Sequence, residues 1–591
     1  MQFAPLDWTI LVAFFAVSLG IGAYASRRAS QGFAAFFLGG RAMPWWLLGV
    51  SMVATTFATD TPNLVADIVR SDGVVGNWVW WAFLLTGMLT VFFYARLWRR
   101  SEVLTDIEFY ELRYSGKPAA FLRGFRAVYL GVVFNVIVMA NVTLAAIKIG
   151  GVMLGWSPLE TVLLAAGVTM VYSALGGLTG VLLTDFIQFA LALLGAIGAA
   201  WYVVNLPEVG GLAALTSHPN VTPAMAFLPD FSTMGWDVLV PIFVVPLAVQ
   251  WWASYYPGAE PGGGGYVAQR MLAAKDERHA TGAVLLFNTL FIAFRPWPWI
   301  LVALASLVVF PDLASIQAQF PDVEKVANDL AYPAMLTFLP AGLLGVVVTS
   351  LAAAYMSTMS SQVNWGASVL VNDVVLRFVD AEASDRRQVW LGRMFTVVLM
   401  ALACVLALAL ESALQGFNLL LQIGAGTGLL LLLRWYWWRV NAAAEITGMV
   451  ASFGIASLLF VNDGFGLPGW QQFLLIVAVT TTAWVLVMLL TKPTDAGVLR
   501  SFYAKVRPIG PGWQAVRRQA EADGTALPPP PKSDASAALA CFLASVIGVY
   551  TLLFATGFFL YGDAGKGAVC ASLAVVSWAV VARLWGRLAL D

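Results

Sequence analysis

The chain has 591 residues, of which 60% are hydrophobic and only 11% are charged, and its 33 basic residues balance its 33 acidic ones. This composition indicates an integral membrane protein, and the balanced charge excludes a basic surface for nucleic acid. Three scattered cysteines and two isolated histidines lack the spacing of a metal or redox site, and no nucleophile–base pair indicates an enzyme.

Apolar segments long enough to cross a bilayer recur along almost the whole chain. They are joined mostly by short loops, so we expect one polytopic helical bundle rather than several soluble domains. Counting runs of about 18 apolar residues or more predicts fifteen spans: 7–25, 45–66, 76–95, 126–153, 157–174, 180–204, 235–256, 280–309, 333–364, 390–411, 417–438, 443–461, 470–490, 536–560 and 567–585.

The distribution of Lys and Arg predicts the orientation of these spans. With the N-terminus outside, nearly all basic residues fall in inward connections, including Arg270 after the seventh span. This positive-inside pattern indicates an external N-terminus and a cytoplasmic C-terminus. Lys148 and Arg295 are exceptions because they lie inside predicted spans, and Lys148 can snorkel toward the outer surface.

The second span is polar in its middle, over residues 53–63. Pro62 has no backbone N–H and disfavours helical geometry at Thr61, so we predict a break in the helix. Broken helices expose carbonyl groups and helix ends that bind ions and substrates in secondary transporters. The alternative is a proline kink repaired by threonine hydroxyls. Asp60 favours the break, because an acid inside a membrane is costly unless it faces a cavity or a partner.

Two further charged residues lie within the predicted bundle. Asp185, at the start of the sixth span, is either a ligand for a cation or an acid that bonds to backbone near the inner interface. Arg295, in the eighth span, can bind an anionic substrate group, pair with a carboxylate such as Asp60, or snorkel to an interface. The sequence leaves these alternatives open.

A stripe of hydroxyl groups lies within the ninth span. Ala354, Ser357, Thr358 and Ser361 recur at helical spacing and share one face, with Ser360 beside them. Hydroxyl oxygens inside a membrane can replace the water around a small hard cation. Alternatively, such hydroxyls bond back to carbonyls of their own helix. Because five small or polar positions cluster here and acids are available elsewhere, we predict a cation site.

Four segments resemble the sodium:solute symporter family, which includes bacterial sodium/galactose, proline and sialic acid transporters. They are Phe37–Trp46, Ala174–Gln188, Gln269–Lys275 and Ala354–Asn364. The resemblance implies an all-α LeuT-type fold with two inverted five-helix repeats. We expect an extra N-terminal helix and inner loop at 1–44, the repeats at 45–204 and 235–440, two additional helices at 441–490, a cytoplasmic linker at 491–535 and two C-terminal helices at 536–591.

The resemblance also implies binding sites. One sodium ion would bind the carbonyls of Ala54, Phe57 and Ala354 and the hydroxyls of Ser357 and Thr358, and a second would bind Asp185, Ser357, Ser360 and Ser361. The number of ions stays open. Family sugar carriers have an amide where Thr61 falls, and the glycine-rich segment 257–265 looks like an insertion beside Tyr266. The expected substrate residues are Asp60, Thr61, Tyr266, Arg295 and Gln422.

We therefore expect a symporter of the plasma membrane, here a bacterial inner membrane, that imports a small polar solute by alternating access. The driving ion would be sodium, the only metal expected, and the solute a sugar, an amino acid or a carboxylate. Proton coupling through Asp60 or Asp185 is an alternative, as is a transporter-like membrane sensor, although 491–535 is too short for a kinase domain. The expected partners are the substrate and the bilayer, and the sequence gives no oligomeric state.

Overall fold

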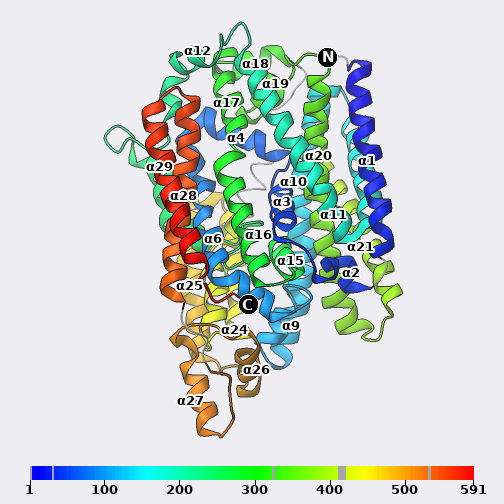
Figure 1. Cartoon of the computed structure of the whole chain (residues 1–591), viewed down its shortest axis with the longest axis vertical. Coiled ribbons are helices and arrows are strands. Elements are labelled where there is room, and N and C mark those ends of the chain that lie inside the picture. The colour runs from blue at the N-terminus through cyan, green and yellow to red at the C-terminus, as the bar shows by residue number, and fades with distance from the viewer. Residues whose placement is uncertain (1–2, 30–31, 322–325, 410–420, 530–533, 591) are drawn as a thin grey trace.

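The computed structural model describes residues 3–29, 32–321, 326–409, 421–529 and 534–590. In these segments every regular element is a helix, apart from two isolated bridges that join Met43 to Ala274 and Ser254 to Ala425. Figure 1 shows long helices standing side by side, with the N-terminus at one end of the bundle. Twelve helices of the described residues are long and apolar enough to cross a membrane. The expectation of an all-α, polytopic membrane protein is confirmed.

The twelve helices coincide with twelve of the predicted spans, and the second, fifth and eleventh spans have no counterpart among them. The second span is divided between two shorter helices, and the fifth is the apolar helix Pro158–Val171, which is too short to qualify. The eleventh span, 417–438, begins outside the described residues. The number of fifteen therefore stays a prediction.

Many of the helices are interrupted or continued by short segments labelled η, which are 3₁₀ turns or π-helical turns. The first part of the chain contains α1 (Pro5–Ala29), α2 (Phe33–Leu38), η1 (Gly39–Arg41), α3 (Trp45–Thr55), α4 (Asp60–Asp72), η2 (Val74–Asn77), α5 (Trp78–Trp81), α6 (Phe83–Leu89), η3 (Thr90–Tyr94), α7 (Ala95–Ser101), α8 (Phe109–Arg113), α9 (Gly116–Val128), η4 (Tyr129–Phe134), α10 (Asn135–Leu154), α11 (Pro158–Val204), α12 (Leu212–Ser217) and η5 (Thr222–Met225).

The second part contains α13 (Trp236–Leu239), η6 (Val240–Val244), η7 (Pro246–Gln250), α14 (Trp251–Ala253), α15 (Gly265–Ala273), α16 (Glu277–Thr289), η8 (Leu290–Phe294), α17 (Trp297–Val309), α18 (Leu313–Gln319), η9 (Asn328–Leu330), α19 (Ala331–Leu336), α20 (Leu343–Val369), η10 (Leu370–Val379) and α21 (Asp385–Ala409). The last part contains α23 (Gly428–Tyr436), α24 (Ala442–Val461), η11 (Asp463–Gly466), α25 (Gly469–Leu490), α26 (Ala496–Val506), η12 (Pro511–Trp513), α27 (Gln514–Ala522), α28 (Ala535–Leu560) and α29 (Ala564–Trp585).

The polar second span is broken, as its sequence predicts. α3 ends at Thr55, and four non-helical residues precede the start of α4 at Asp60. Thr61 itself is helical, and Pro62 lies in the first turn of α4, where its missing N–H removes no helical hydrogen bond. The break therefore lies on the N-terminal side of the proline, over residues 56–59, rather than at Thr61.

Two long helices, α11 and α20, pack against each other and position the hydroxyl stripe. α11 joins the predicted spans 157–174 and 180–204 through a bend at Gly177, whose φ of 54° suits a residue without a side chain. α20 packs against α11, α1, α10 and α3. Almost all of α20 is buried, so its polar residues face protein rather than lipid.

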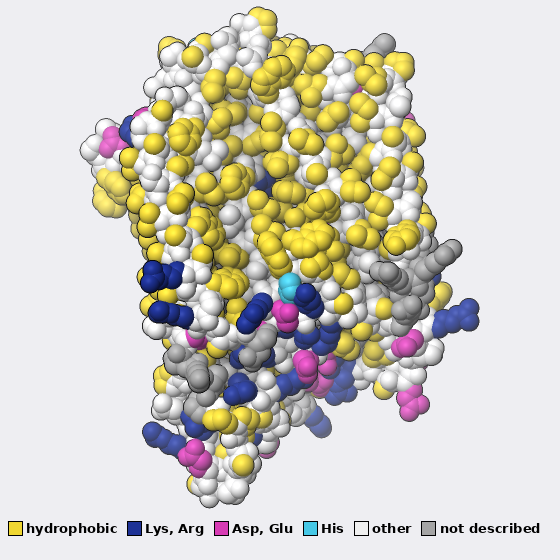
Figure 2. Space-filling model, in the orientation of Figure 1, with side chains coloured by type: hydrophobic (Ala, Val, Ile, Leu, Met, Phe, Trp, Pro, Cys, Tyr) yellow, Lys and Arg dark blue, Asp and Glu magenta, His cyan; other side chains and the backbone are white. Residues whose placement is uncertain are grey.

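The expected linker 491–535 contains two short helices, α26 and α27, that pack against one end of the bundle. Trp513 is buried, stacks on Phe502 with ring centroids 5.3 Å apart, and donates from its indole N–H to the carbonyl of Trp435 at 2.9 Å. Figure 2 shows Lys and Arg side chains gathered toward this lower end, below a broad hydrophobic surface.

Candidate functional site

The break between α3 and α4 meets the hydroxyl stripe of α20. The hydroxyl of Thr358 donates to the carbonyl of Thr55 at 2.7 Å, and the carbonyl of Ala354 lies 3.2 Å from the same hydroxyl. The carbonyl of Ala54 accepts the N–H of Phe57 at 3.0 Å, which tightens the end of α3. We call this meeting of oxygen atoms the junction. Ala54, Phe57, Ala354 and Thr358, which were predicted for the first sodium ion, all belong to these two segments.

Ser357, predicted for both sodium ions, forms its hydrogen bond away from the junction. Its hydroxyl donates to Oδ1 of Asp185 at 2.6 Å, and the hydroxyl of Ser51 donates to Oδ2 at 2.5 Å. Asp185, Ser51 and Ser357 are at most 1% exposed. Asp185 therefore lies between α3, α11 and α20 in the interior of the bundle, where its carboxylate accepts hydrogen bonds from serine hydroxyls rather than from backbone.

Arg270, in the connection between the seventh and eighth predicted spans, completes this cluster. The residue lies in α15 and is 0% exposed. Its guanidinium donates to Ser361 at 2.5 Å and to Ser51 at 3.2 Å, and lies 3.9 Å from a carboxylate oxygen of Asp185. A buried arginine is stable here because a carboxylate and several oxygen acceptors surround it. We call Ser51, Asp185, Arg270, Ser357 and Ser361 the charged cluster.

The hydroxyl of Ser360, beside the stripe, bonds back to a carbonyl of its own helix. Ser360 donates to the carbonyl of Ser357 on its own helix at 3.0 Å. Ser361 contacts the hydroxyl of Thr55 at 2.8 Å, so it connects the charged cluster with the junction. The structure thus brings Asp185, Ser357 and Ser361 together, while the hydroxyl of Ser360 is directed to backbone.

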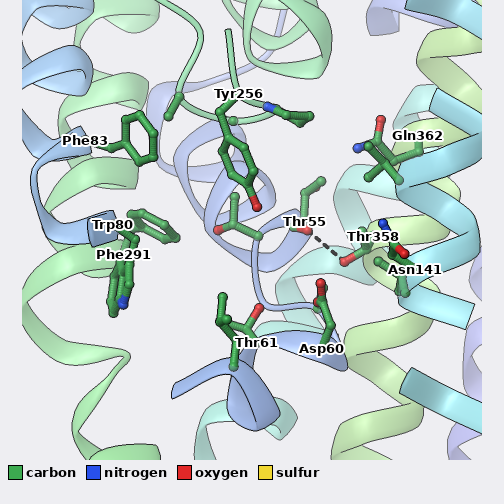
Figure 3. Close-up of a pocket in the computed structure, with 18 of the residues that line it drawn as sticks. Thr55, Asp60, Thr61, Trp80, Phe83, Asn141, Tyr256, Phe291, Thr358 and Gln362 are labelled. Carbon is green, nitrogen blue, oxygen red and sulfur yellow. Dashed lines mark hydrogen bonds between the residues drawn. The ribbon is translucent and has the colours of Figure 1, made fainter. Parts of the chain in front are cut away.

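A cavity of about 130 Å³ borders the junction. Figure 3 shows Trp80, Phe83 and Phe291 on one side of it and Asn141, Thr358 and Gln362 on the other. Asp60, Thr61, Tyr266 and Arg295, four of the five predicted substrate residues, line this cavity, and so do Thr55 and Thr358 of the junction. Gln422 is half-buried and is not among the lining residues.

Several polar atoms at this cavity have no hydrogen-bond partner among the described residues. They are Oδ1 of Asp60, Oδ1 of Asn141 and Nε of Arg295. Buried polar atoms in folded proteins are nearly always hydrogen-bonded, so unpartnered atoms around a cavity indicate a place for a polar ligand.

The position of Arg295 excludes one of its three alternatives. The side chain is 2% exposed, which excludes snorkelling to an interface. It donates to the carbonyl of Thr56, and its guanidinium lies 4.0 Å from the ring centroid of Phe291. The negative charge of Asp60 acts on the guanidinium, although no ion pair of Arg295 is found among the described residues. Lys148, the other basic residue inside a span, forms an ion pair with Asp329 at 3.4 Å.

The sequence pattern missed several of these residues. Arg270 lies in a segment, Gln269–Lys275, that was recognised but given no role, and Ser51 precedes Thr55 by one helical turn. The aromatic residues of the cavity carry no signal, because large aromatic side chains also occur in protein cores and at membrane interfaces. The missed residues are Ser51, Thr55, Trp80, Phe83, Asn141, Tyr256, Arg270, Phe291 and Gln362.

The chain is similar to known transporters. The sodium/glucose cotransporter of Vibrio parahaemolyticus is 26% identical over 477 residues, which cover 77% of this chain and 85% of that protein. The sodium/myo-inositol cotransporter of Canis lupus familiaris is 25% identical over 498 residues, which cover 76% and 66%. A solved Na⁺-coupled sialic acid symporter superposes with a TM-score of 0.68 at 19% identity, covering 84% of this chain and 99% of that one, which shows the shared fold.

The family model described as the sodium:solute symporter family matches residues 36–452, more than half of the chain. Its members are transporters and not enzymes, and the fold of this chain is of the LeuT type, as the sequence resemblance implied. The chain belongs to the sodium:solute symporter family.

Proposed function

We propose that this chain is a sodium-coupled symporter that imports a small polar organic solute across a bacterial inner membrane. The observation that carries the proposal is that the junction and the cavity share a wall. Thr55 and Thr358 supply oxygen atoms to the junction and also line the cavity. A cation bound at the junction would hold α3 and α20 together and so favour the conformation in which the cavity binds solute.

The first sodium ion would bind at the junction. Its ligands would be the carbonyls of Ala54, Phe57 and Ala354 and the hydroxyls of Ser357 and Thr358, to which the structure adds the carbonyl of Thr55. Neutral oxygen atoms from a broken helix and a facing helix suit a small hard cation. The related cotransporters are named for sodium, which supports this ion. Each sodium charge that enters would supply about 2.3 kcal/mol per 100 mV of membrane potential.

A second sodium ion would bind Asp185 with Ser357, Ser360 and Ser361. Arg270 lies 3.9 Å from this carboxylate and already supplies a positive charge to it. A second ion would therefore share Asp185 with the guanidinium, and hydroxyls that now bond to Asp185 and Arg270 would turn toward the ion.

The solute would bind between Asp60 and Arg295. These side chains offer a carboxylate and a guanidinium, while Trp80 and Phe291 offer flat apolar walls. Such a lining suits a sugar, an amino acid or a carboxylate, because a few polar groups fix the orientation of a ligand while aromatic faces bury its carbon atoms. Thr61, Tyr266 and Gln422 would complete the binding residues.

We also propose that the N-terminus lies outside, that the C-terminus is cytoplasmic and that residues 45–204 and 235–440 form the two inverted repeats. The gathering of Lys and Arg at the end that carries α26 and α27 supports this orientation, because cytoplasmic loops are rich in positive charge.

Uptake into proteoliposomes tests the proposal. Purified protein would be reconstituted and offered radiolabelled sugars, amino acids, nucleosides and carboxylates under an inward sodium gradient. We expect at least one sugar, amino acid or carboxylate to accumulate with sodium and not with an equal potassium gradient. Accumulation that follows a proton gradient and ignores sodium would contradict the proposal.

A further inference from the structure

A carboxyl group lies behind the cavity, in the segment 254–264 that connects α14 with α15. Glu260 belongs to the glycine-rich segment 257–265 and is only 3% exposed. Gly265 makes room for it: a Cβ at this position would lie 2.9 Å from Oε1 of Glu260. The segment therefore packs a carboxyl group into a space that a larger residue would fill.

This carboxyl group has no positive partner among the described residues. Its oxygen Oε2 is buried and accepts no hydrogen bond, and no described Lys, Arg or His forms an ion pair with it. The backbone N–H groups of Gly258 and Glu260 itself are the donors that face the carboxyl group. The titratable side chains that act on it are another acid, Asp106, and three tyrosines: Tyr255, Tyr256 and Tyr266.

Asp106, the acid next to Glu260, has a hydrogen-bond donor on each carboxylate oxygen. Oδ1 of Asp106 accepts the indole N–H of Trp365 at 2.9 Å, and Oδ2 accepts the N–H of Gly265 at 2.9 Å. The positive charge of Arg434 also acts on Asp106. Asp106 and Glu260 thus meet at Gly265, the first residue of α15, where one carboxylate has donors on both oxygens and the other does not.

This difference determines how the two acids share their charge. An ionised carboxylate that is buried without a cation or enough donors is costly, and such a group takes up a proton instead. Two nearby acids cannot both ionise easily, so the one with the better donors keeps its charge. We propose that Glu260 is a proton-binding site, which holds a proton in this conformation while Asp106 stays ionised.

The proton would leave when water reaches the segment 254–264 during the transport cycle. The O–H bond of the Glu260 carboxyl group would break, the proton would pass to water, and the carboxylate would be hydrated. Because Tyr256 and Tyr266 contact the cavity, the protonation of Glu260 would influence the cavity wall. This site is separate from the junction and from the charged cluster, so the inference does not depend on which ion drives transport.

Infrared spectroscopy of the purified full-length protein tests this proposal without sodium or solute. The spectrum of the wild type minus that of Glu260→Gln should contain the C=O band of a protonated carboxyl group at neutral pH, and the band should vanish at strongly alkaline pH. Asp106→Asn serves as the matched control and should keep the band. The proposal would be overturned if the difference spectrum contained no such band. It would also be overturned if Asp106→Asn lost the band while Glu260→Gln kept it.

Two further measurements keep the proposal testable if Glu260→Gln folds poorly. Glutamate labelled with ¹³C at its side-chain carboxyl should shift the band in the wild-type protein, whereas labelled aspartate should leave it in place. The wild type should also lose thermal stability more steeply than Glu260→Gln as pH rises, because its native state binds one more proton than its unfolded state. A shift with labelled aspartate alone, or equal slopes for the two proteins, would count against Glu260.

Discussion

Two places inside the bundle each contain one aspartate and one arginine, and they differ in how well these charges are matched. In the charged cluster, both carboxylate oxygens of Asp185 accept hydroxyl donors, and Arg270 contacts two serines and lies beside the carboxylate. At the cavity, Asp60 and Arg295 each retain an unpartnered polar atom and form no ion pair with each other.

This difference separates an internal joint from the proposed binding site. The bonds of the charged cluster connect α3, α11, α15 and α20, so an external ligand has to replace contacts that already exist. The polar atoms at the cavity gain hydrogen bonds when a ligand arrives. The same pair of residue types can therefore stabilise the bundle in one place and recognise a solute in another.

Removal of Arg270 should have the largest effect. Arg270→Gln leaves Asp185 buried beside no cation, which costs about 3–5 kcal/mol for a broken buried pair. We expect a large fall in the thermal unfolding temperature of the purified protein. Arg295→Gln is the matched control and should stay closer to the wild type, because Arg295 forms no close ion pair among the described residues and only the charge of Asp60 acts on it.

Addition of Asp185→Asn to Arg270→Gln should restore part of the lost stability, because the unpaired charge disappears. Equal stability of Arg270→Gln and the wild type would show that the charged cluster is not a structural joint.

Removal of Arg295 should have the next largest effect, on solute binding rather than on stability. A hydrogen bond to a charged group contributes about 1.5–3 kcal/mol, so Arg295→Gln should weaken solute affinity by roughly 10- to 100-fold. Uptake at increasing solute concentrations measures this change. Arg295→Lys keeps the charge and should lose less, and unaltered affinity in Arg295→Gln would remove Arg295 from the binding site.

Removal of the Thr358 hydroxyl should have a smaller effect, confined to the affinity for sodium. Thr358→Ala deletes one oxygen atom of the junction, so the sodium concentration for half-maximal uptake should rise by about tenfold. Thr358→Ser keeps the hydroxyl and should resemble the wild type. Unchanged sodium dependence in Thr358→Ala would contradict the assignment of the first sodium ion.

Neutralisation of Asp185 tests whether the charged cluster also binds an ion. If a second sodium ion shares this carboxylate, Asp185→Asn should lower the sodium Hill coefficient to about one. Sodium titration of uptake measures the coefficient, and an unaltered value would limit the cluster to its structural role.

Another aspartate–arginine pair, in which Asp534 precedes the span Ala535–Leu560, provides a small reference effect. Burial opposes the ionisation of Asp534, but hydrogen bonds from Arg96 and from the N–H of Ala589 outweigh it and hold the pKa of Asp534 below its ordinary value. A lowered pKa means that this contact stabilises the protein above about pH 4 and that the contribution is lost as pH falls further.

Limited proteolysis of the segment 491–535 measures this contact. Cleavage should accelerate in acid, and Asp534→Asn should show the same modest acceleration at neutral pH. Equal cleavage rates for Asp534→Asn and the wild type at neutral pH would show that the Arg96 contact does not hold this segment.

The sequence could predict the features that depend on neighbouring residues. Apolar length predicts the spans, Pro62 predicts the break before α4, and helical spacing predicts the stripe that includes Ser357 and Thr358. Charges inside predicted spans singled out Asp185 and Arg295 as candidate site residues.

Contacts between distant segments could not be predicted in this way. Arg270 and Ser51 are 219 residues apart, and only the packing of α15 against α3 brings them together. A rule based on local hydropathy places such an arginine in a loop, because it cannot include the partner that makes burial tolerable. For the same reason the unpartnered oxygen of Asn141 could not be recognised from the sequence as part of a cavity.

Charge movement in a membrane that contains the reconstituted protein tests the central claim most directly. The solute found by uptake would be added in the presence of sodium while the current is recorded. We expect a solute-induced current that requires sodium, disappears at the same solute concentration in Arg295→Gln, and needs more sodium in Thr358→Ala. A current of equal size without sodium, or one that Arg295→Gln leaves intact, would contradict the account of a sodium-coupled cavity between Asp60 and Arg295.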